Sequence, residues 1–316
     1  MSQLPDAFLR RSAEILSPPD FQAMRASQQS PPVSVRWTGP ADQVGEAQSY
    51  LSRHDIGATA VDWHVESWQV AAQDRQAMLA LPWVIRQRLF PQSLSSIAAV
   101  LGMDVRPGMD VLDLCAAPGG KTSLIRREQH GQGVLVANEL SRARAARLSK
   151  LLSTHELTGV DVQIADGRTL GSRMARCFDC ILADVPCSGE GRFVDGQPAR
   201  WASWSEGTIK GLARRQISLL DSACQCLRIG GSVLYATCTM APEENEGVIH
   251  RLLTKVCARR GIEMEAEPIT LSLPQKRPAR TSWKGVTYHS DVSHAIRIVA
   301  GGGMTPFFLA KLRRLR

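Results

Sequence analysis

The chain has 316 residues, with 38 Lys and Arg against 30 Asp and Glu, which leaves a formal net charge of +8. This length, with 44% hydrophobic and 22% charged residues, excludes a peptide and a globally disordered chain, and it indicates about two domains. No apolar run approaches the roughly 18 residues of a membrane helix, and the N-terminus lacks an apolar signal-peptide core. We therefore predict a soluble cytoplasmic protein with no membrane partner. The positive charge is compatible with a polyanionic partner and equally with a basic protein that has none.

Eight cysteines are too few for a disulfide scaffold, and without a secretion signal we expect reduced thiols. Two close pairs, Cys177 with Cys180 and Cys224 with Cys226, reach the ligand number of a zinc site. The first pair leads into an apolar strand, the second lies late in a predicted helix, and the seven histidines show no ligand spacing. We predict that the protein binds no metal.

The first hundred residues contain short patterned segments between turn-forming clusters of Ser, Pro and Gly. Residues 33–37 alternate like a strand, 43–54 have a helical pattern, and 59–65 again predict a strand. We predict that residues 1–100 form a small α+β accessory domain.

From about Met109 short apolar runs alternate with longer helical stretches. Strands are predicted at 111–114, 134–138, 160–165, 178–184 and 232–237, with helices from Lys121, from Ala143, over 209–227 and entered through Pro242. Such alternation is typical of a parallel, doubly wound α/β sheet. We predict that residues 101–316 form this domain, whose ligands should lie beyond the carboxyl ends of the strands.

The first strand runs into the turn DLCAAPGGKT, which resembles a phosphate-binding P-loop. That motif requires a glycine five residues before its second glycine, and Cys115 stands there, so a P-loop is disfavoured. The small residues still allow a ligand to approach the N–H groups at the start of the next helix. A tight turn with no ligand remains an equal alternative on this segment alone.

Acidic residues follow the next two strands. Glu139, 26 residues after Asp113, stands where a carboxylate can accept both hydroxyls of a ribose, and Asp166 is placed to face an adenine edge. A turn and two acids at successive strand ends fit a nucleoside cofactor without a pyrophosphate. We predict S-adenosylmethionine.

Two thiols follow the fourth and fifth strands. Cys187 lies in DVPCSGEG and Cys238 in YATCTM, so the sheet should place both on neighbouring loops at the cofactor rim. An inert buried cysteine is the usual alternative, but these segments are turns, and we favour a chemical role for both.

These segments resemble the Sun/Nop RNA cytosine-5 methyltransferases. The resemblance covers about residues 92–250 through LDLCAAPGGKT, ANEL, DVPCSGEG and YATCTMAPEENE. It implies a Rossmann-like class I S-adenosylmethionine-dependent methyltransferase fold with a small N-terminal α+β domain. The opening LPDAFLRR, the GEG after Cys187 and the ending FFLAKLRRLR are most similar to the F subgroup of bacterial 16S ribosomal RNA methyltransferases, whose additional C-terminal domain we expect this chain to lack.

The resemblance also implies roles for individual residues. Cys238 would attack carbon 6 of cytosine, Cys187 would assist removal of the carbon 5 proton and enzyme release, and Asp184 would bind the base edge and contact the cofactor. Glu139 would bind the ribose and Asp166 the adenine. The remaining cofactor contacts implied are Cys115, Ala116, Ala117, Pro118, Gly119, Gly120, Lys121 and Arg144.

The resemblance implies an RNA partner, with ribosomal RNA or the 30S subunit favoured over transfer RNA, and a monomeric enzyme. A paired cytosine cannot reach the thiols, so the base must be flipped out or already single-stranded. Candidate RNA contacts are Arg36, Trp37, Arg192, Phe193 and the basic stretch 311–316, although a solvated basic face is an alternative for each. A DNA cytosine-5 methyltransferase that uses Cys187 as nucleophile and a catalytically silent RNA-binding assembly factor remain competing hypotheses.

Overall fold

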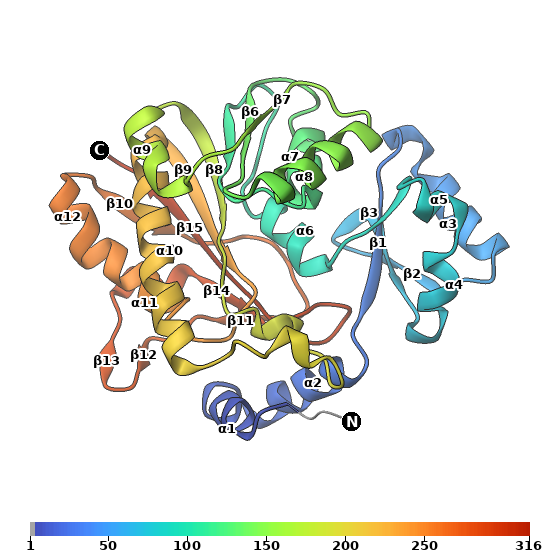
Figure 1. The fold of residues 1–316 in the computed structure, drawn as a ribbon, viewed down its shortest axis with the longest axis horizontal. Helices are drawn as coiled ribbons and strands as arrows, with labels where there is room; N and C mark the ends of the chain where they lie inside the picture. The colour runs from blue at the N-terminus through green and yellow to red at the C-terminus, as the bar shows by residue number, and fades with distance from the viewer. Residues whose placement is uncertain (1–3) are drawn as a thin grey trace.

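The computed structural model describes residues 4–316, which form a four-stranded and a nine-stranded β-sheet side by side and a separate two-stranded hairpin. Figure 1 shows the small N-terminal sheet on the right and the central sheet with its helices filling the rest of the molecule. Within the described residues, no helix is both long and apolar enough to span a bilayer.

The small sheet has the strand order β2-β3-β1-β4 and packs against three short helices. Its elements are β1 (Val33–Trp37), α3 (Val44–Arg53), β2 (Ala58–Val61), β3 (His64–Val70), α4 (Arg75–Leu79), α5 (Pro82–Ile85) and β4 (Leu89–Pro91). The predicted strand 33–37 is confirmed. The single strand predicted over 59–65 is wrong, because the chain turns at Asp62 and Trp63 and pairs β2 with β3 as a hairpin.

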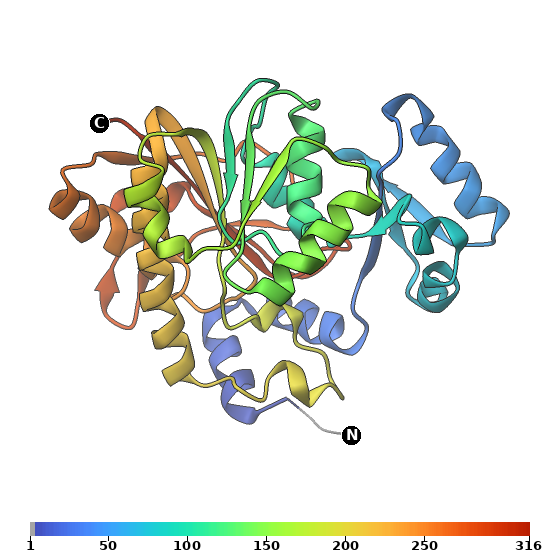
Figure 2. The same cartoon turned by 45° about the horizontal axis from the view of Figure 1, so that its top comes forward.

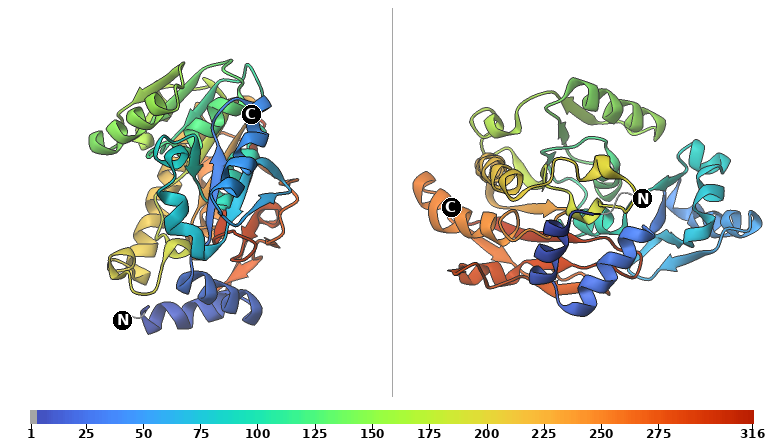
Figure 3. Two further views of the ribbon diagram at one scale, coloured as in Figure 1. Left: turned by 90° about the vertical axis from the view of Figure 1, so that its right-hand side faces the viewer. Right: turned by 60° about the horizontal axis from the view of Figure 1, so that its bottom comes forward.

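The first two helices, α1 (Asp6–Ile15) and α2 (Pro18–Gln29), do not pack on the small sheet. Phe8 and Met24 instead pack with Phe193 and Trp201, which belong to the loop after β8 of the central sheet. The rings of Phe8 and Phe193 lie 5.1 Å apart. The right panel of Figure 3 shows this helical pair lying across the end of the molecule that faces the viewer. A domain boundary at residue 100 stays a prediction.

The central sheet has the order β11-β14-β15-β9-β8-β5-β6-β7, with β10 also paired to β15. The strands β5 to β9 are parallel neighbours, and β15 is antiparallel to β9. The first half contains α6 (Leu94–Leu101), β5 (Val111–Asp113), α7 (Gly120–Glu128), β6 (Leu135–Asn138), α8 (Arg142–Thr154), β7 (Val160–Gln163), α9 (Leu170–Arg173) and β8 (Phe178–Asp184). The second half contains α10 (Glu206–Cys226), β9 (Leu227–Thr237), α11 (Glu246–Arg251), α12 (Cys257–Arg260), β10 (Met264–Glu267), β11 (Lys276–Pro278), β12 (Ser282–Trp283), β13 (Val286–Thr287), β14 (Ile296–Ile298) and β15 (Phe307–Arg314).

Two apolar layers hold the central sheet between helices. Val111 and Leu135 face α6 and α7, whereas their neighbours Leu112 and Val136 face the layer of α9, α10 and α11. Figure 2 shows helices on both sides of the strands. Burying each such side chain contributes about 1.5–3 kcal/mol, which explains why near-continuous apolar strands form the middle of the sheet. The predicted doubly wound α/β fold is confirmed.

One predicted helix start is wrong. The sequence predicted a helix entered through Pro242 with Glu243 and Glu244 in its first turn, but residues 242–245 form turns and α11 begins at Glu246. Glu244 is fully buried in that turn and accepts hydrogen bonds from the Ser188 N–H, at 3.0 Å, and from Gln216. The acidic residues at this position therefore bind a neighbouring loop instead of starting a helix.

Candidate active site

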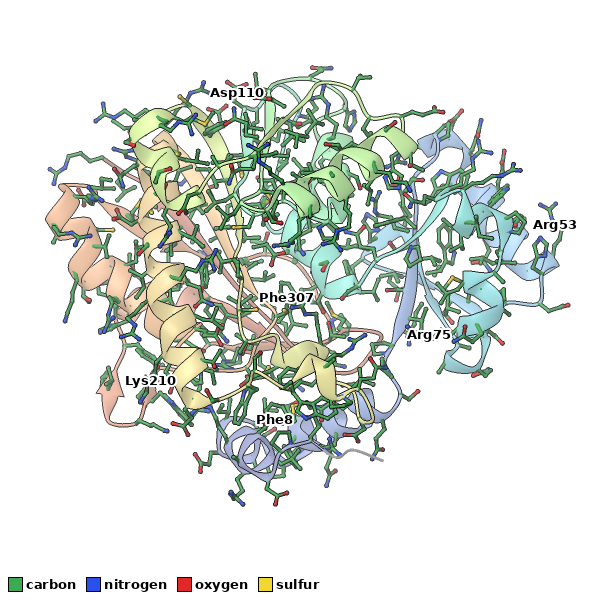
Figure 4. The ribbon with its side chains drawn as sticks, viewed as in Figure 1. Phe8, Arg53, Arg75, Asp110, Lys210 and Phe307 are labelled. Carbon is green, nitrogen blue, oxygen red and sulfur yellow. The ribbon has the colours of Figure 1, made fainter. Side chains whose placement is uncertain are left out.

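A cleft of about 600 Å³ opens at the carboxyl ends of β5, β8 and β9. Asp113, Asp184, Cys187 and Cys238 line it, as sequence reasoning expected of residues that follow parallel strands. A second cavity of about 270 Å³ shares Lys121, Asp184, Arg192 and Cys238 with it and adds Phe307, which is labelled near the middle of Figure 4. We call the two together the thiol cleft.

The two loop cysteines are in contact. Cys187 and Cys238 are free thiols whose Sγ atoms lie 3.3 Å apart, and the Cys238 N–H donates to the Cys187 Sγ. Donation from Cys187 to Cys238, together with burial and the charge of Cys238, raises the pKa of Cys187 well above its ordinary value. The same hydrogen bond and the positive charges of Arg192 and Lys121 lower the pKa of Cys238, although burial opposes this. Cys238 is therefore the thiol of the pair that ionises more readily, and thiolates are the nucleophilic form of cysteine.

Arg192, which follows the GEG segment, lines both cavities of the thiol cleft. Attraction to the Cys238 sulfur is the main cause that raises the pKa of Arg192. The sequence indicated Arg192 as an RNA contact, and the structure places it beside Cys238. The sequence motif around Cys187 ends at Gly191, so it did not indicate that Arg192 would lie next to this thiol.

Lys121 and Asp184 form an ion pair across the cleft, with the lysine Nζ 2.7 Å from Asp184 Oδ2. Burial acts to lower the pKa of Lys121, but the attraction and hydrogen bond of Asp184 outweigh it and raise that pKa. Beneath the pair, burial raises the pKa of Asp113 to about 7, and the Thr122 hydroxyl donates to its Oδ2. The lysine predicted to contact the cofactor is thus bound to Asp184, on the loop side of the cleft that also carries Cys187.

Buried polar contacts hold the two thiol loops together. Glu190, 2% exposed, accepts hydrogen bonds from Trp204 Nε1 at 2.8 Å, the Thr239 hydroxyl at 2.8 Å and the Met240 N–H at 3.0 Å. Ser188 and Thr239 hydroxyls lie 2.8 Å apart. These bonds join the loop of Cys187 to the loop of Cys238, so the position of one thiol fixes that of the other.

The turn after β5 forms the cofactor side of the cleft. Arg144 crosses to this turn and donates from Nη2 to the Ala117 carbonyl at 2.7 Å, and it forms an ion pair with Glu139. Glu139 is 3% exposed, and its Oε1 accepts the Ser141 N–H, whereas its buried Oε2 accepts no hydrogen bond from residues 4–316. This oxygen has Arg144 Nη1 3.3 Å away as an ion-pair partner, and it can still accept the hydroxyls of a ribose.

Most of the residues predicted to contact the cofactor line the cleft, namely Cys115, Ala116, Ala117, Pro118, Gly120, Lys121, Arg144 and Asp184. Gly119, Glu139 and Asp166 lie next to it, outside the lining. Gly119 has a φ of +110° and no room for a side chain, because a Cβ would lie 2.7 Å from Leu148. Arg168 forms an ion pair with the carboxylate of Asp166 at 2.5 Å.

Three predicted RNA contacts, Arg36, Trp37 and Phe193, are wrong because their side chains are buried. Arg36 and Trp37 are 1% and 0% exposed, and Phe193 packs between α1 and Trp201. The basic stretch 311–316 is largely strand β15, where Arg313 pairs with Glu267 and Arg314 donates to buried carbonyls. A strand that carries several charged side chains and a basic tail have similar sequences, so the sequence alone did not distinguish them. Among residues 4–316 no three potential metal ligands form a cluster.

The fold and the arrangement of the cleft define a class I S-adenosylmethionine-dependent methyltransferase. A model of the family described as 16S rRNA methyltransferase RsmB/F matches residues 100–313, and the chain belongs to this family. The cofactor of the family, S-adenosylmethionine, is the one the sequence predicted.

Curated relatives agree with this assignment. Ribosomal RNA small subunit methyltransferase F of Shigella dysenteriae is 32% identical over 250 residues, which cover 77% of this chain and 52% of the relative. The protein of the same name from Serratia proteamaculans is 31% identical over 287 residues, covering 88% and 58%. The chain thus spans about half the length of the curated relatives it matches.

Two solved structures share the fold over nearly the whole chain. A methyltransferase homolog protein from Pyrococcus horikoshii has a TM-score of 0.77 at 24% identity and covers 99% of this chain and 100% of its own. NSun6 from the same organism has a TM-score of 0.77 at 17% identity and covers 99% and 98%.

Proposed function

We propose that the protein transfers a methyl group from S-adenosylmethionine to carbon 5 of a cytosine in 16S ribosomal RNA through a covalent bond between Cys238 and the base. The observation that carries this proposal is the pair of free thiols 3.3 Å apart whose pKa values shift in opposite directions. Family membership and the relatives named small subunit methyltransferase F support the ribosomal substrate.

Carbon 5 of cytosine is too weak a nucleophile to take a methyl group directly. The Cys238 thiolate donates its electron pair to carbon 6 and forms an S–C bond, and the electrons of the 5,6 double bond make carbon 5 nucleophilic. Arg192 and Lys121 lower the pKa of Cys238 and so favour its ionisation before this step. When bound, S-adenosylmethionine supplies the electrophilic methyl group.

Cys187 completes the reaction. Its thiol stays protonated while Cys238 is an anion, because that charge and the hydrogen bond raise the Cys187 pKa. Once Cys238 is bonded to carbon, this charge is gone, and Cys187 can lose its proton to solvent and then take the proton of carbon 5. The electron pair of that C–H bond re-forms the double bond and expels Cys238 as a thiolate, which Cys187 again hydrogen-bonds.

Asp184 and Lys121 position the base. The Asp184 carboxylate, held by Lys121 at 2.7 Å, can accept the amino N–H of cytosine, and Lys121 supplies positive charge where the ring becomes electron-rich. On the opposite side, Glu139 with its unbonded Oε2 would bind the ribose, and the turn of residues 115–121 with Arg144 would bind the rest of the cofactor. Asp166 would contact the adenine.

The test is incubation of the purified protein with radiolabelled S-adenosylmethionine, total RNA and 30S subunits from a strain lacking the gene, followed by mapping of 5-methylcytosine. We expect label in 16S ribosomal RNA that is lost in Cys238→Ala. Label in transfer RNA alone would overturn the substrate and keep the chemistry. No label in any RNA would favour an assembly factor that binds RNA without modifying it.

The order of the two thiols is tested separately. Cys187→Ala should trap a covalent complex with RNA that migrates slowly on denaturing gels, because bond formation by Cys238 remains and release is blocked. The double variant Cys187→Ala/Cys238→Ala is the matched control and should show no complex. A complex formed by Cys238→Ala would make Cys187 the nucleophile, as in the DNA enzymes.

A further inference from the structure

A further pocket, separate from the two cavities of the thiol cleft, encloses about 540 Å³. It lies between α10, the segment 243–255 and the β12–β13 hairpin. We call it the hairpin pocket. Its wall is apolar and aromatic, with Ile217, Trp283, Val286 and Tyr288. Its cationic side chains are Lys210, Arg214, Arg251, Lys255 and Lys284.

The positive charge of this pocket is largely uncompensated. Within residues 4–316, Lys210, Arg214, Arg251 and Lys255 are exposed and form no ion pair, and Lys284 lies 3.7 Å from Glu206. The one carboxylate in the lining, Glu243, is already bonded to Arg11 and to Trp283 Nε1. Burial and the positive charges of His289, Lys255 and Arg251 lower the pKa of His250, which also lines the pocket. An anionic ligand would therefore meet attraction on most sides.

The aromatic wall is ordered before any ligand arrives. Lys284 and Gly285 have φ values of +46° and +80°, so the β12–β13 hairpin closes through the tight turn that suits twisted strands. Trp283 Nε1 donates to Glu243 Oε1 at 3.1 Å, and the Arg280 guanidinium lies 5.0 Å from the Trp283 ring. The ring edge is thus fixed beside the free cations, so little entropy is lost in ordering it when a ligand binds.

The hairpin pocket is linked to the thiol cleft through shared elements. Glu243 lines the pocket, and the next residue, Glu244, accepts the N–H of Ser188 beside Cys187. Gln216, on the same helix as Arg214 and Ile217, donates to Glu244 and to the Pro186 carbonyl. In Figure 4, Lys210 is labelled near the start of α10, to one side of Phe307. The hairpin pocket and the thiol cleft are therefore both reached from the end of the sheet where the loops after β8 and β9 emerge.

We propose that the hairpin pocket binds a single-stranded segment of the same RNA whose cytosine occupies the thiol cleft. Phosphates lie against Arg214, Arg251 and Lys255, and a base packs on the wall of Trp283 and Tyr288. Cations beside aromatic rings are the combination by which proteins hold single-stranded nucleic acid. This inference rests on the proposed function, because it takes the RNA substrate as the ligand.

The test compares two double variants of the full chain that each remove one arginine and one lysine. Arg214→Ala/Lys255→Ala alters the hairpin pocket, and Arg147→Ala/Lys150→Ala removes exposed cations of α8 outside it. The probe is a fluorescein-labelled single-stranded pyrimidine RNA, titrated at several salt concentrations. For the pocket variant we expect about tenfold weaker binding at physiological salt and a salt slope reduced by about 1.4, from two lost phosphate contacts. The control variant should match the unaltered protein.

Three results would overturn the proposal. The first is equal affinities for all three proteins, the second is equal losses in both variants, and the third is an unchanged salt slope in the pocket variant. An oligoglutamate peptide that binds in place of the RNA, with RNA affinity unchanged in the pocket variant, would assign the surface to an acidic protein. RNA binding is read without methyl transfer, so failure of methylation with a preserved affinity difference would count against the proposed function alone.

Discussion

Two buried glutamates on opposite sides of the thiol cleft are bonded very differently. Glu190, on the thiol side, accepts three hydrogen bonds from Trp204, Thr239 and Met240. Glu139, on the cofactor side, is equally buried, but its Oε2 accepts no hydrogen bond from the described residues. Both side chains are 3% exposed or less.

This difference distinguishes a carboxylate whose hydrogen-bond donors all come from the folded chain from one whose remaining donors must come from a ligand. A buried carboxylate with all its partners stabilises the folded chain, whereas one with an unbonded oxygen carries a desolvation cost that a ligand can offset. We therefore expect the loops of Cys187 and Cys238 to be held in place before any ligand binds, and the region of Glu139 and Arg144 to be completed when the cofactor binds. The following variants test that distinction.

The largest effect is expected for Glu190→Ala. Each hydrogen bond to a charged group contributes about 1.5–3 kcal/mol, and since Thr239 can turn to another partner we expect a loss of about 3 to 5 kcal/mol in the free energy of unfolding. Urea unfolding measures it, and Glu190→Gln, which keeps one acceptor oxygen, should lose less. Unchanged stability with weaker cofactor binding would remove the distinction between the two glutamates.

An intermediate effect is expected for Glu139→Ala. Loss of the acceptor for the ribose should weaken S-adenosylmethionine binding about 10- to 100-fold, which corresponds to about 1.4 to 2.8 kcal/mol, with little change in ligand-free melting. Calorimetric titration measures the affinity. The control is Glu46→Ala, an exposed helix residue of the same charge. A fall in melting temperature with unaltered affinity would show that Glu139 is structural.

The smallest effect concerns the charge on Cys238. Arg192 lowers the pKa of Cys238, so Arg192→Ala should raise that pKa and move the rise of activity with pH to higher pH. Below the new pKa less of the thiol is ionised, so we expect a reaction that is several-fold slower at neutral pH. Arg192→Lys keeps the charge and should change the profile less. The rate of iodoacetamide alkylation at Cys238 reports the same titration, and an unchanged profile would exclude this role of Arg192.

The sequence predicted which residues line the thiol cleft well, because parallel strands bring these residues together. Asp184, Cys187 and Cys238 follow β8 and β9, whose pairing brings their carboxyl ends together, so residues 51 positions apart meet at 3.3 Å. Apolar runs of four to seven residues were enough to find those strands. The residue types in the motifs then indicated the kind of chemistry to expect.

Contacts between elements that are distant in sequence could not be predicted. The burial of Arg36 depends on Gln92 and Ser123, which accept its hydrogen bonds at 2.8 and 2.7 Å, and no local pattern shows that these partners will arrive. The packing of Phe8 on Phe193 likewise depends on a helix and a distant loop meeting. Charge and aromaticity indicated RNA contacts at Arg36 and Phe193, and tertiary packing assigned both to the interior.

The antiparallel strand β15 has a consequence for how the chain folds. It pairs with β9 on one side and with β14 and β10 on the other, so β9, whose last residue precedes Cys238, has an open edge until β15 has been synthesised. Pairings between segments far apart in sequence form slowly because a long loop must close first. We therefore expect the loop that carries Cys238 to be completed late in synthesis, after β5 and β6 have paired.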